Sequence, residues 1–407
     1  MLVIQIFDVV FFLIILITLL LSGLKRDTTL FFVLLTCLYG YYDWIYLLAK
    51  DYVNHSIVLI SGYAKEIAVY LLCMIYMGRL FLNHNKYQQV LLTLSILIVI
   101  SVLGIMNNGL SNYFIGFNSY VPMLLLLIAI CQTDAFVNKK NYINACFILI
   151  VLPNAIFALY QYYNYHMIKD FWFYDSFMNM DLALNEWDYF REGFVRPFGF
   201  FSNTLSLAFF CFFIFVGSSV YSKNSKILVM LISLIPALLS GTRTIFLVAV
   251  LFFCLLFLYK IRMHYKLKTY SYILLVLIGF IGTLFVIVNL SGDLSSLGRV
   301  TQWTDVLTDL KSNPLGHGVG FAGVGLEKWP DSNVIAYIYM AGYIGLVIAL
   351  YFLIKISAVL SKDGNQSYIF LLLILYVALF QNVSAVIMLP IIAMSVKSRV
   401  DNIERCK

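Results

Sequence analysis

The sequence predicts an all-α fold, a polytopic integral membrane helical bundle of about 11 to 13 transmembrane helices that takes in residues 1–407 as a single domain. Of the 407 residues, 62% are hydrophobic and 12% are charged, and the mean hydropathy is +0.91. A soluble domain has about 25% charged residues, because its surface faces water. We therefore expect most of the outer surface of this chain to face hydrocarbon.

The apolar segments are continuous, as at residues 11–17 and 91–102, whereas the strands of a membrane barrel alternate apolar and polar residues. Backbone N–H and C=O groups in hydrocarbon must be satisfied internally, so continuous apolar segments predict helices. The last segment, 367–396, is long enough for one tilted helix, or for two short helices broken near Gln381 and Asn382. The candidate spans are residues 2–22, 29–49, 57–81, 88–106, 114–131, 143–161, 198–220, 227–241, 244–260, 270–290, 333–356 and 367–396.

Lysine and arginine collect in alternate loops, and short loops rich in these residues face the cytoplasm. This basic set of loops begins with Lys25 and Arg26 and continues to Lys362. The opposite set contains the two long loops, residues 162–197 and 291–332, which we expect on the outward, non-cytoplasmic side. The basic tail should also be cytoplasmic, and a broken final hairpin would reconcile its position with the other loops.

Cysteine spacing and net charge exclude several kinds of site. The seven cysteines form no CxxC pair and lie mostly within apolar segments, as small packing residues do. We therefore expect no metal site and no disulfide framework. The net charge of +7 is explained by the cytoplasmic loops, so it does not indicate a nucleic-acid partner.

The first long outward loop is rich in aromatic residues, among them Trp187. Trp and Tyr rings are enriched at the headgroup depth of membranes, so these residues could form an interfacial belt. Aromatic faces also stack on sugar rings. Under that second interpretation, Trp187 and, in the second long loop, Trp303 are the candidate sugar-binding residues.

Three arginines, Arg196, Arg243 and Arg299, lie on the expected outward side, each in an apolar setting. Arginines in such places are usually paired or functional, although snorkelling to lipid phosphates is an alternative. A planar guanidinium binds phosphate oxygens in a bidentate manner and keeps its charge when buried. These residues therefore predict an outward site for a lipid-linked diphosphate, which an enzyme or a transporter could use.

The second long loop contains a segment, residues 297–310, that predicts an amphipathic helix lying along the membrane surface. Its apolar side chains recur at helical spacing: Val300, Trp303, Val306, Leu307 and Leu310. Asn313 and Pro314 end this helix. The closely spaced glycines around His317 let the backbone approach a ligand or another helix. No lysine followed by Ser or Thr comes after them, so they do not form a phosphate loop.

Motifs between about residues 190 and 350 resemble the superfamily of O-antigen ligases and O-antigen polymerases, bacterial enzymes of surface-polysaccharide synthesis. The motifs are, in order, Arg196-Pro-Phe-Gly-Phe-Phe-Ser-Asn-Thr-Leu, Ser240-Gly-Thr-Arg243-Thr, Gly298-Arg299 with Trp303, Asn313-Pro-Leu-Gly-His-Gly-Val-Gly, and Asp331-Ser-Asn ahead of Gly342-Tyr-Ile-Gly345-Leu. Residues before 190 are similar to the superfamily in hydropathy only.

The resemblance implies glycosyl transfer at the periplasmic face of the bacterial inner membrane. The donor would be an oligosaccharide on undecaprenyl diphosphate, and neither a metal, a cofactor nor a nucleotide would take part. The implied partners are this lipid-linked oligosaccharide and membrane lipid, with a flippase and a chain-length regulator beside them. Arg196, Arg243 and Arg299 would hold the diphosphate and stabilise its developing charge.

Ligases of the superfamily have a histidine just before the span that begins near Asn333, where it is proposed to activate the acceptor. This chain has Asp331 and no histidine in that stretch, which favours a polymerase. The attacking hydroxyl then needs another proton acceptor, for which Asp331, Glu192 and His317 are the candidates in that order. Asp331 could instead cap the following helix, and His317 could be structural.

Two other functions remain open. An O-antigen ligase would move finished glycan to the lipid A core instead of extending it. A lipid-linked oligosaccharide flippase would carry its charges inside the spans, where this chain has few: Asp8, Asp43 and the adjacent Lys65 and Glu66.

Overall fold

A computed structural model describes residues 2–49, 55–82, 87–164, 190–191, 194–201, 203–221, 226–290, 294–323, 325–363 and 365–396. The chain forms two compact units. The first comprises Met1–Met74, Thr133–Ile245 and Ala385–Lys407, and the second comprises Ile75–Gln132 and Phe246–Ser384. The all-α fold expected from the sequence is confirmed.

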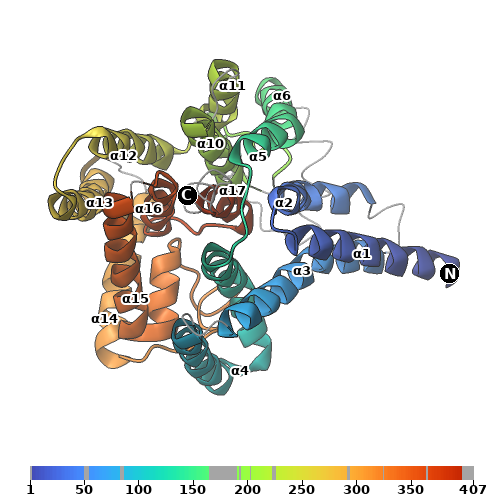
Figure 1. Cartoon of the computed structure of the whole chain (residues 1–407), viewed down its shortest axis with the longest axis horizontal. Helices are drawn as coiled ribbons and strands as arrows, with labels where there is room; N and C mark the ends of the chain where they lie inside the picture. Colours follow the sequence, from blue (N-terminus) through green and yellow to red (C-terminus); the bar gives the residue numbers. More distant parts are fainter. Residues whose placement is uncertain are drawn as a thin grey trace, which may run out of the picture. The chain divides into compact units, whose positions relative to one another are not determined.

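The first unit is a helical assembly in which α17, late in the sequence, packs against the early helix α2 and against α10 (Figure 1). Its elements are α1 (Leu2–Gly23), α2 (Thr29–Ala49), most of α3 (His55–Phe81), α5 (Lys139–Cys146), the π-helical turn η1 (Phe147–Val151), α6 (Leu152–Tyr163), the hairpin of β1 (Phe190–Arg191) and β2 (Phe194–Val195), α10 (Thr204–Tyr221), α11 (Lys226–Leu239), the first residues of α12 (Arg243–Lys260) and α17 (Ala385–Ser395).

Helix α10 forms the core of this first unit. Its phenylalanines Phe209, Phe210, Phe212 and Phe213 are almost fully buried, although they point in different directions around the helix. A helix that is apolar all round must be covered on all sides. The neighbouring α11 and α17 provide part of that cover.

The second unit is organised around α15, which contacts α4, α13, α14 and α16. Its helices are the end of α3, α4 (Tyr87–Gln132), most of α12, α13 (Tyr265–Leu290), α14 (Leu294–Ser312), α15 (Asn333–Asp363) and α16 (Ser367–Ala378). Val306 and Leu310 of α14 pack with Val319 and Phe321, which follow it, and with Tyr339 of α15. This cluster is the hydrophobic core that joins the second long loop to α15.

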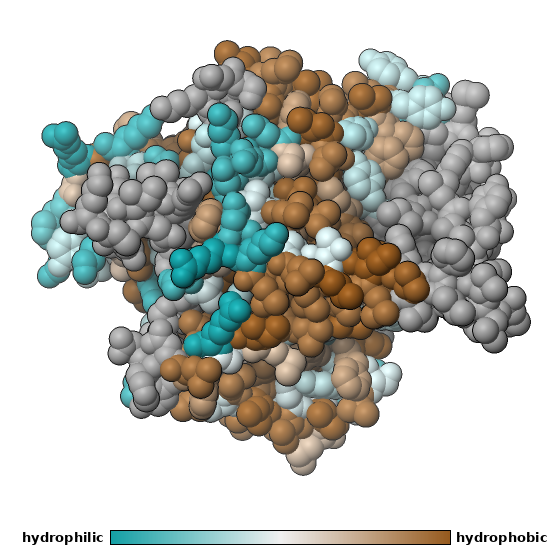
Figure 2. Space-filling view, turned by 45° about the vertical axis from the view of Figure 1, so that its right-hand side comes forward, coloured by the Kyte–Doolittle hydropathy of each residue, from teal (hydrophilic) through white to brown (hydrophobic). Residues whose placement is uncertain are grey.

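The surface of these helices is that of a multi-pass membrane protein. Six helical segments in the described part of the chain are long and apolar enough to cross a bilayer: Leu91–Ile130, Lys139–Tyr163, Thr204–Tyr221, Arg243–Lys260, Tyr265–Phe285 and Asn333–Lys362. Shorter apolar helices accompany them. On α12, Phe246, Val250, Phe253 and Phe257 are exposed at helical spacing, which makes a stripe suited to lipid. Hydrophobic side chains cover much of the face drawn in Figure 2.

The final segment is two short helices, α16 and α17, as one of its two interpretations predicted. Two other helix boundaries differ from the expected spans. The span expected over 198–220 begins only at Thr204, because the preceding residues form a turn. The spans expected at 88–106 and 114–131 are joined through helical residues into α4, whose one non-helical residue is Gly109 (φ 78°, ψ 166°).

Gly109 bends α4 sharply. Tyr113 lies twelve residues after Ser101, yet its hydroxyl is 3.3 Å from the Ser101 hydroxyl. Twelve residues of straight helix would span about 18 Å. The two halves of α4 therefore fold back toward each other, as two separate spans would.

Candidate functional site

Arg196 is positioned by a turn that two buried amide side chains of α6 hold in place. Oε1 of Gln161 accepts hydrogen bonds from the backbone N–H of Phe198 (3.2 Å) and Gly199 (2.8 Å), and its Nε2 donates to the Gly199 carbonyl (3.2 Å). Oδ1 of Asn154 accepts from the N–H of Phe200 at 2.7 Å. Gly199 has φ 61°, a conformation that suits glycine. Helix α10 therefore starts later than expected, because these residues pair with side chains instead of with a helix.

The Arg196 side chain then meets the turn between α11 and α12. Its Nε donates to the carbonyl oxygen of Ser240 at 2.8 Å. Its side chain also lies beside Gly241, which has φ 63° and reverses the chain. Arg243 is the first residue of α12 and is exposed. Two of the three predicted arginines are thus gathered at one turn, together with the amino-terminal end of an 18-residue helix, which attracts anions.

Arg299 lies in the second unit, where it pairs with Asp331. Its Nε is 3.6 Å from Oδ2 of Asp331, and the two side chains are 19% and 47% exposed. Gln302, almost one helical turn after Arg299, accepts a hydrogen bond from the Asp331 backbone N–H at 2.9 Å. Side chains of α14 therefore hold both the backbone N–H and the carboxylate of Asp331.

The cap of α15 is Ser332, whereas the sequence left Asp331 as a possible cap. The Ser332 hydroxyl oxygen accepts from the Ile335 N–H at 3.2 Å and its proton is donated to the Ala378 carbonyl at 2.8 Å. Asn333 adds a contact at the same end, where its Oδ1 accepts from the Val383 N–H. The Asp331 carboxylate is consequently directed to Arg299 and not to the helix end.

The glycine loop, residues 313–323, repairs a break in α15. Gly342 (φ 58°, ψ −139°) interrupts that helix, so the carbonyls of Tyr339 and Met340 lose their helical partners. His317 and Gly318 supply replacement N–H groups at 2.8 and 2.9 Å. In return, the Tyr343 N–H donates to the Pro314 carbonyl at 3.0 Å.

The same loop lies against α4 on its other side. The Val319 N–H donates to the Ile100 carbonyl at 3.1 Å. A Cβ added to Gly318 would be 2.1 Å from the backbone nitrogen of Gly104, and one added to Gly320 would be 2.7 Å from Asn112. The expectation that these glycines permit a close backbone approach is confirmed, and the approach is to two helices.

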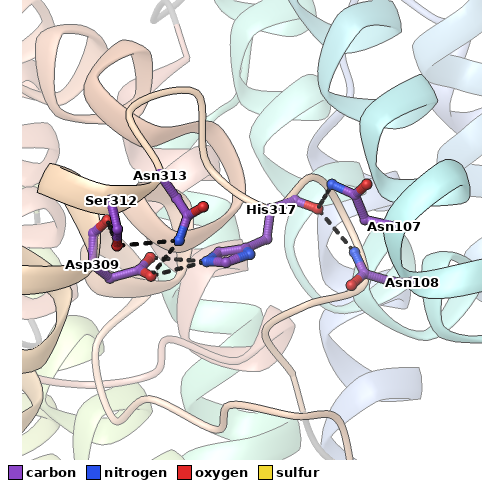
Figure 3. Close-up of polar contacts among 6 residues, drawn as sticks. All are labelled: Asn107, Asn108, Asp309, Ser312, Asn313 and His317. Carbon is purple, nitrogen blue, oxygen red and sulfur yellow. Dashed lines mark hydrogen bonds and ion pairs between the residues drawn. The ribbon is translucent and has the colours of Figure 1, made fainter.

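His317 is held rigidly within this loop (Figure 3). Its Nε2 is 3.1 and 3.0 Å from the two carboxylate oxygens of Asp309, which also accepts from Asn313 Nδ2 at 2.9 Å. The imidazole stacks on the Phe321 ring, with centroids 3.9 Å apart and planes within 11°. Asn108 of α4 donates to the His317 carbonyl at 3.0 Å. This pair of a carboxylate and an imidazole is a recurrent arrangement for handling protons.

The remaining predicted residues have mixed outcomes. Trp303 is partly buried, and its ring packs edge to face against Phe280 with centroids 5.2 Å apart, so the ring contributes to packing. Leu307 was expected on the apolar face of α14 but is 50% exposed, because Val306 and Leu310 already fill that face. Glu192 and Trp187 lie outside the described residues.

Asp309 is the functional candidate that the sequence did not reveal. It lies eight residues before His317, on a helix whose one other acidic residue, Asp305, is exposed to solvent as on an ordinary polar face. The chain reversal at Asn313 and Pro314 is what brings the two side chains together. The sequence did contain a signal for this pair. An aspartate lies in the last turn of α14, and a histidine follows among glycines shortly after the helix ends.

Comparison with known proteins gives no relative to guide these assignments: the chain matches no family model, no curated protein and no solved structure. The candidate site therefore rests on the geometry and chemistry of its own residues.

Proposed function

We propose that this protein is a glycosyltransferase that polymerises oligosaccharide repeat units carried on undecaprenyl diphosphate. The observation that carries the proposal is the gathering of Arg196 and Arg243 at the turn that begins α12. Two guanidinium groups and a helix amino terminus in a membrane protein suit a lipid-linked diphosphate. The order of the sequence motifs, which resembles that of O-antigen ligases and polymerases, supports the same class of function, and the lack of a histidine just before Asn333 favours the polymerase.

In the proposed reaction, Arg196 and Arg243 of the first unit bind the diphosphate of the donor; for Arg299, in the second unit, this role is implied by the sequence resemblance alone. As the glycosidic bond to phosphate breaks, negative charge grows on the leaving diphosphate, and fixed positive charges lower the energy of that state. Asp331, beside Arg299, would balance the arginine charge while no substrate is bound. Asp331, Glu192 and His317 are the candidates for accepting the proton of the attacking hydroxyl.

The test is chain extension by the purified protein in proteoliposomes that contain a synthetic undecaprenyl-diphosphate repeat unit. Arg196→Lys, Arg243→Lys and Arg299→Lys should each slow extension by at least about tenfold, since lysine lacks the bidentate fork. Arg262→Lys, an exposed arginine in the loop after α12, is the matched control and should extend normally. Normal extension by all three site variants would contradict diphosphate binding by these residues.

A null mutant separates the polymerase from a ligase. Loss of a polymerase leaves core capped with a single repeat unit. Loss of a ligase leaves bare core while polymer accumulates on the carrier lipid. The second result would replace the polymerase by the ligase.

A flippase is the second candidate, and the interrupted helices α4 and α15 favour it. Transporters often form substrate sites at discontinuous helices near the middle of the membrane. Here Gly109 and Gly342 interrupt two helices of one unit. In proteoliposomes that contain the purified protein alone, translocation of a fluorescent lipid-linked oligosaccharide across the membrane without any chain growth would support the flippase and contradict the polymerase.

A further inference from the structure

We propose that His317 is the proton acceptor for the attacking sugar hydroxyl, with Asp309 as the residue that positions it. This assignment rests on the proposed function. It places the proton transfer on the imidazole of the glycine loop, instead of on Asp331. The accepting atom is Nδ1 of His317.

The orientation of the ring identifies that atom. Both oxygens of Asp309 lie within 3.1 Å of Nε2, and a carboxylate can only accept hydrogen bonds. Nε2 of the neutral imidazole therefore carries the hydrogen, and Nδ1 carries the lone pair. Asn313 donates to the same carboxylate, which keeps Asp309 turned toward the ring.

The surroundings fix the ring in this orientation. Phe321 stacks on one face of the imidazole, and the His317 main chain bonds to Tyr339 through its N–H and to Asn107 and Asn108 through its carbonyl. In Figure 3, Asp309 and Asn313 approach the imidazole from one side, while the two asparagines of α4 hold the backbone on the other. A base held in this way loses little orientational freedom when the substrate arrives.

The ring is also reachable. The side chains of His317 and Asp309 are 23% and 24% exposed, so a hydroxyl can approach a pair that is otherwise embedded. Asp331, by comparison, already has a cationic partner in Arg299. A carboxylate that neutralises an arginine is less suited to take up a proton than an imidazole whose Nδ1 has no hydrogen-bond partner among the residues that the structure describes.

The chemical step is balanced. The acceptor hydroxyl gives its proton to Nδ1 of His317 while its oxygen forms a bond to the anomeric carbon of the donor sugar. The bond from that carbon to the phosphate oxygen breaks, and its electron pair leaves with undecaprenyl diphosphate. Asp309 stabilises the imidazolium until it returns the proton to water.

A purely structural pair that ties α14 to the glycine loop is the competing explanation, and imidazole rescue separates the two. His317→Ala removes the ring from its place against Phe321 and leaves a space that imidazole can enter. In proteoliposomes of the full chain, this variant should extend glycan about 10²- to 10⁴-fold more slowly. Added imidazole should restore part of the rate, and more basic imidazoles should restore more.

Asp309→Asn keeps the shape of the side chain and tests the positioning role. It should lower the extension rate and leave the amount of bound donor unchanged. Asp305→Asn, an exposed aspartate one turn earlier on the same helix, is the matched control and should keep the wild-type rate. If His317→Ala cannot be purified, the comparison of these two aspartate variants decides the matter.

Several results would overturn the assignment. Extension by His317→Ala within about twofold of wild type, against the 10²-fold or greater loss expected of a general base, would exclude the proton transfer. A slow, well-folded His317→Ala that imidazole does not rescue would assign the pair a structural role. If Asp309→Asn and Asp305→Asn behave alike, Asp309 does not position the ring. A wild-type protein that extends no chains would instead refute the proposed function itself, and the assignment with it.

Discussion

Individual buried polar residues decide where the helices of this protein begin. Gln161 and Asn154 lie on α6, yet their side chains bond to backbone about 40 residues later in the sequence, at the turn before α10. Hydropathy places residues 198–203 inside a span, because it ignores such long-range partners. The position of Arg196 thus depends on two amides with no charge of their own.

Ser332 offers a test of how much a single polar residue contributes to the start of a helix. Ser332→Ala should lower the thermal unfolding midpoint in detergent, because loss of a serine cap costs about 1 kcal/mol. It would also leave the partly buried Ala378 carbonyl without the Ser332 hydroxyl. Ser361→Ala is the control, since that hydroxyl bonds to the Ser357 carbonyl of its own helix. Equal midpoints for the two variants would show that the cap contributes little.

Among the elements, the sequence predicts the helices well and their interruptions poorly. Apolar length and composition are local properties, so α1, α2, α3 and α11 start and end within a few residues of the expected spans. The break at Gly342 is compensated by backbone hydrogen bonds with the glycine loop, and next to Gly109 the side chains of Asn107 and Asn108 bond to the same loop about 210 residues later. Asp309 was missed for the same reason, since its partner follows a chain reversal.

The glycine loop predicts a contrast between two glycine substitutions. Gly318→Ala should destabilise the second unit strongly, because the new Cβ would lie 2.1 Å from the Gly104 backbone and φ is 81°. Gly282→Ala in α13 meets no atom within 4 Å and should raise stability by about 1 kcal/mol, through better helix propensity. Thermal unfolding of the purified variants measures both effects.

A destabilised Gly282→Ala would mean that α13 is packed more tightly there than described. A neutral Gly318→Ala would mean that the glycine loop can move away from α4 at little cost, which would weaken the case for a rigidly held His317.

For the whole molecule, the membrane orientation is the property that most needs measurement. The distribution of lysine and arginine predicts that the loop between α12 and α13 is cytoplasmic and that the glycine loop is outside. Leu315 and Met263 are exposed residues in these two places. In a cysteine-free background, Leu315→Cys should react with an impermeant maleimide in spheroplasts, and Met263→Cys only after permeabilisation. The reverse pattern would put the proposed site on the wrong side for a periplasmic enzyme.

The hydrogen bonds between α4 and the glycine loop have a consequence for the synthesis of the chain. Asn107 and His317 are 210 residues apart, so α4 enters the bilayer well before its partner exists. At about 5 to 20 residues per second, the interval is roughly 10 to 40 seconds. During that time Asn107 and Asn108 are without their partner in the glycine loop, the His317 carbonyl. The hydrogen bonds between α4 and the glycine loop can therefore form only in the later part of synthesis.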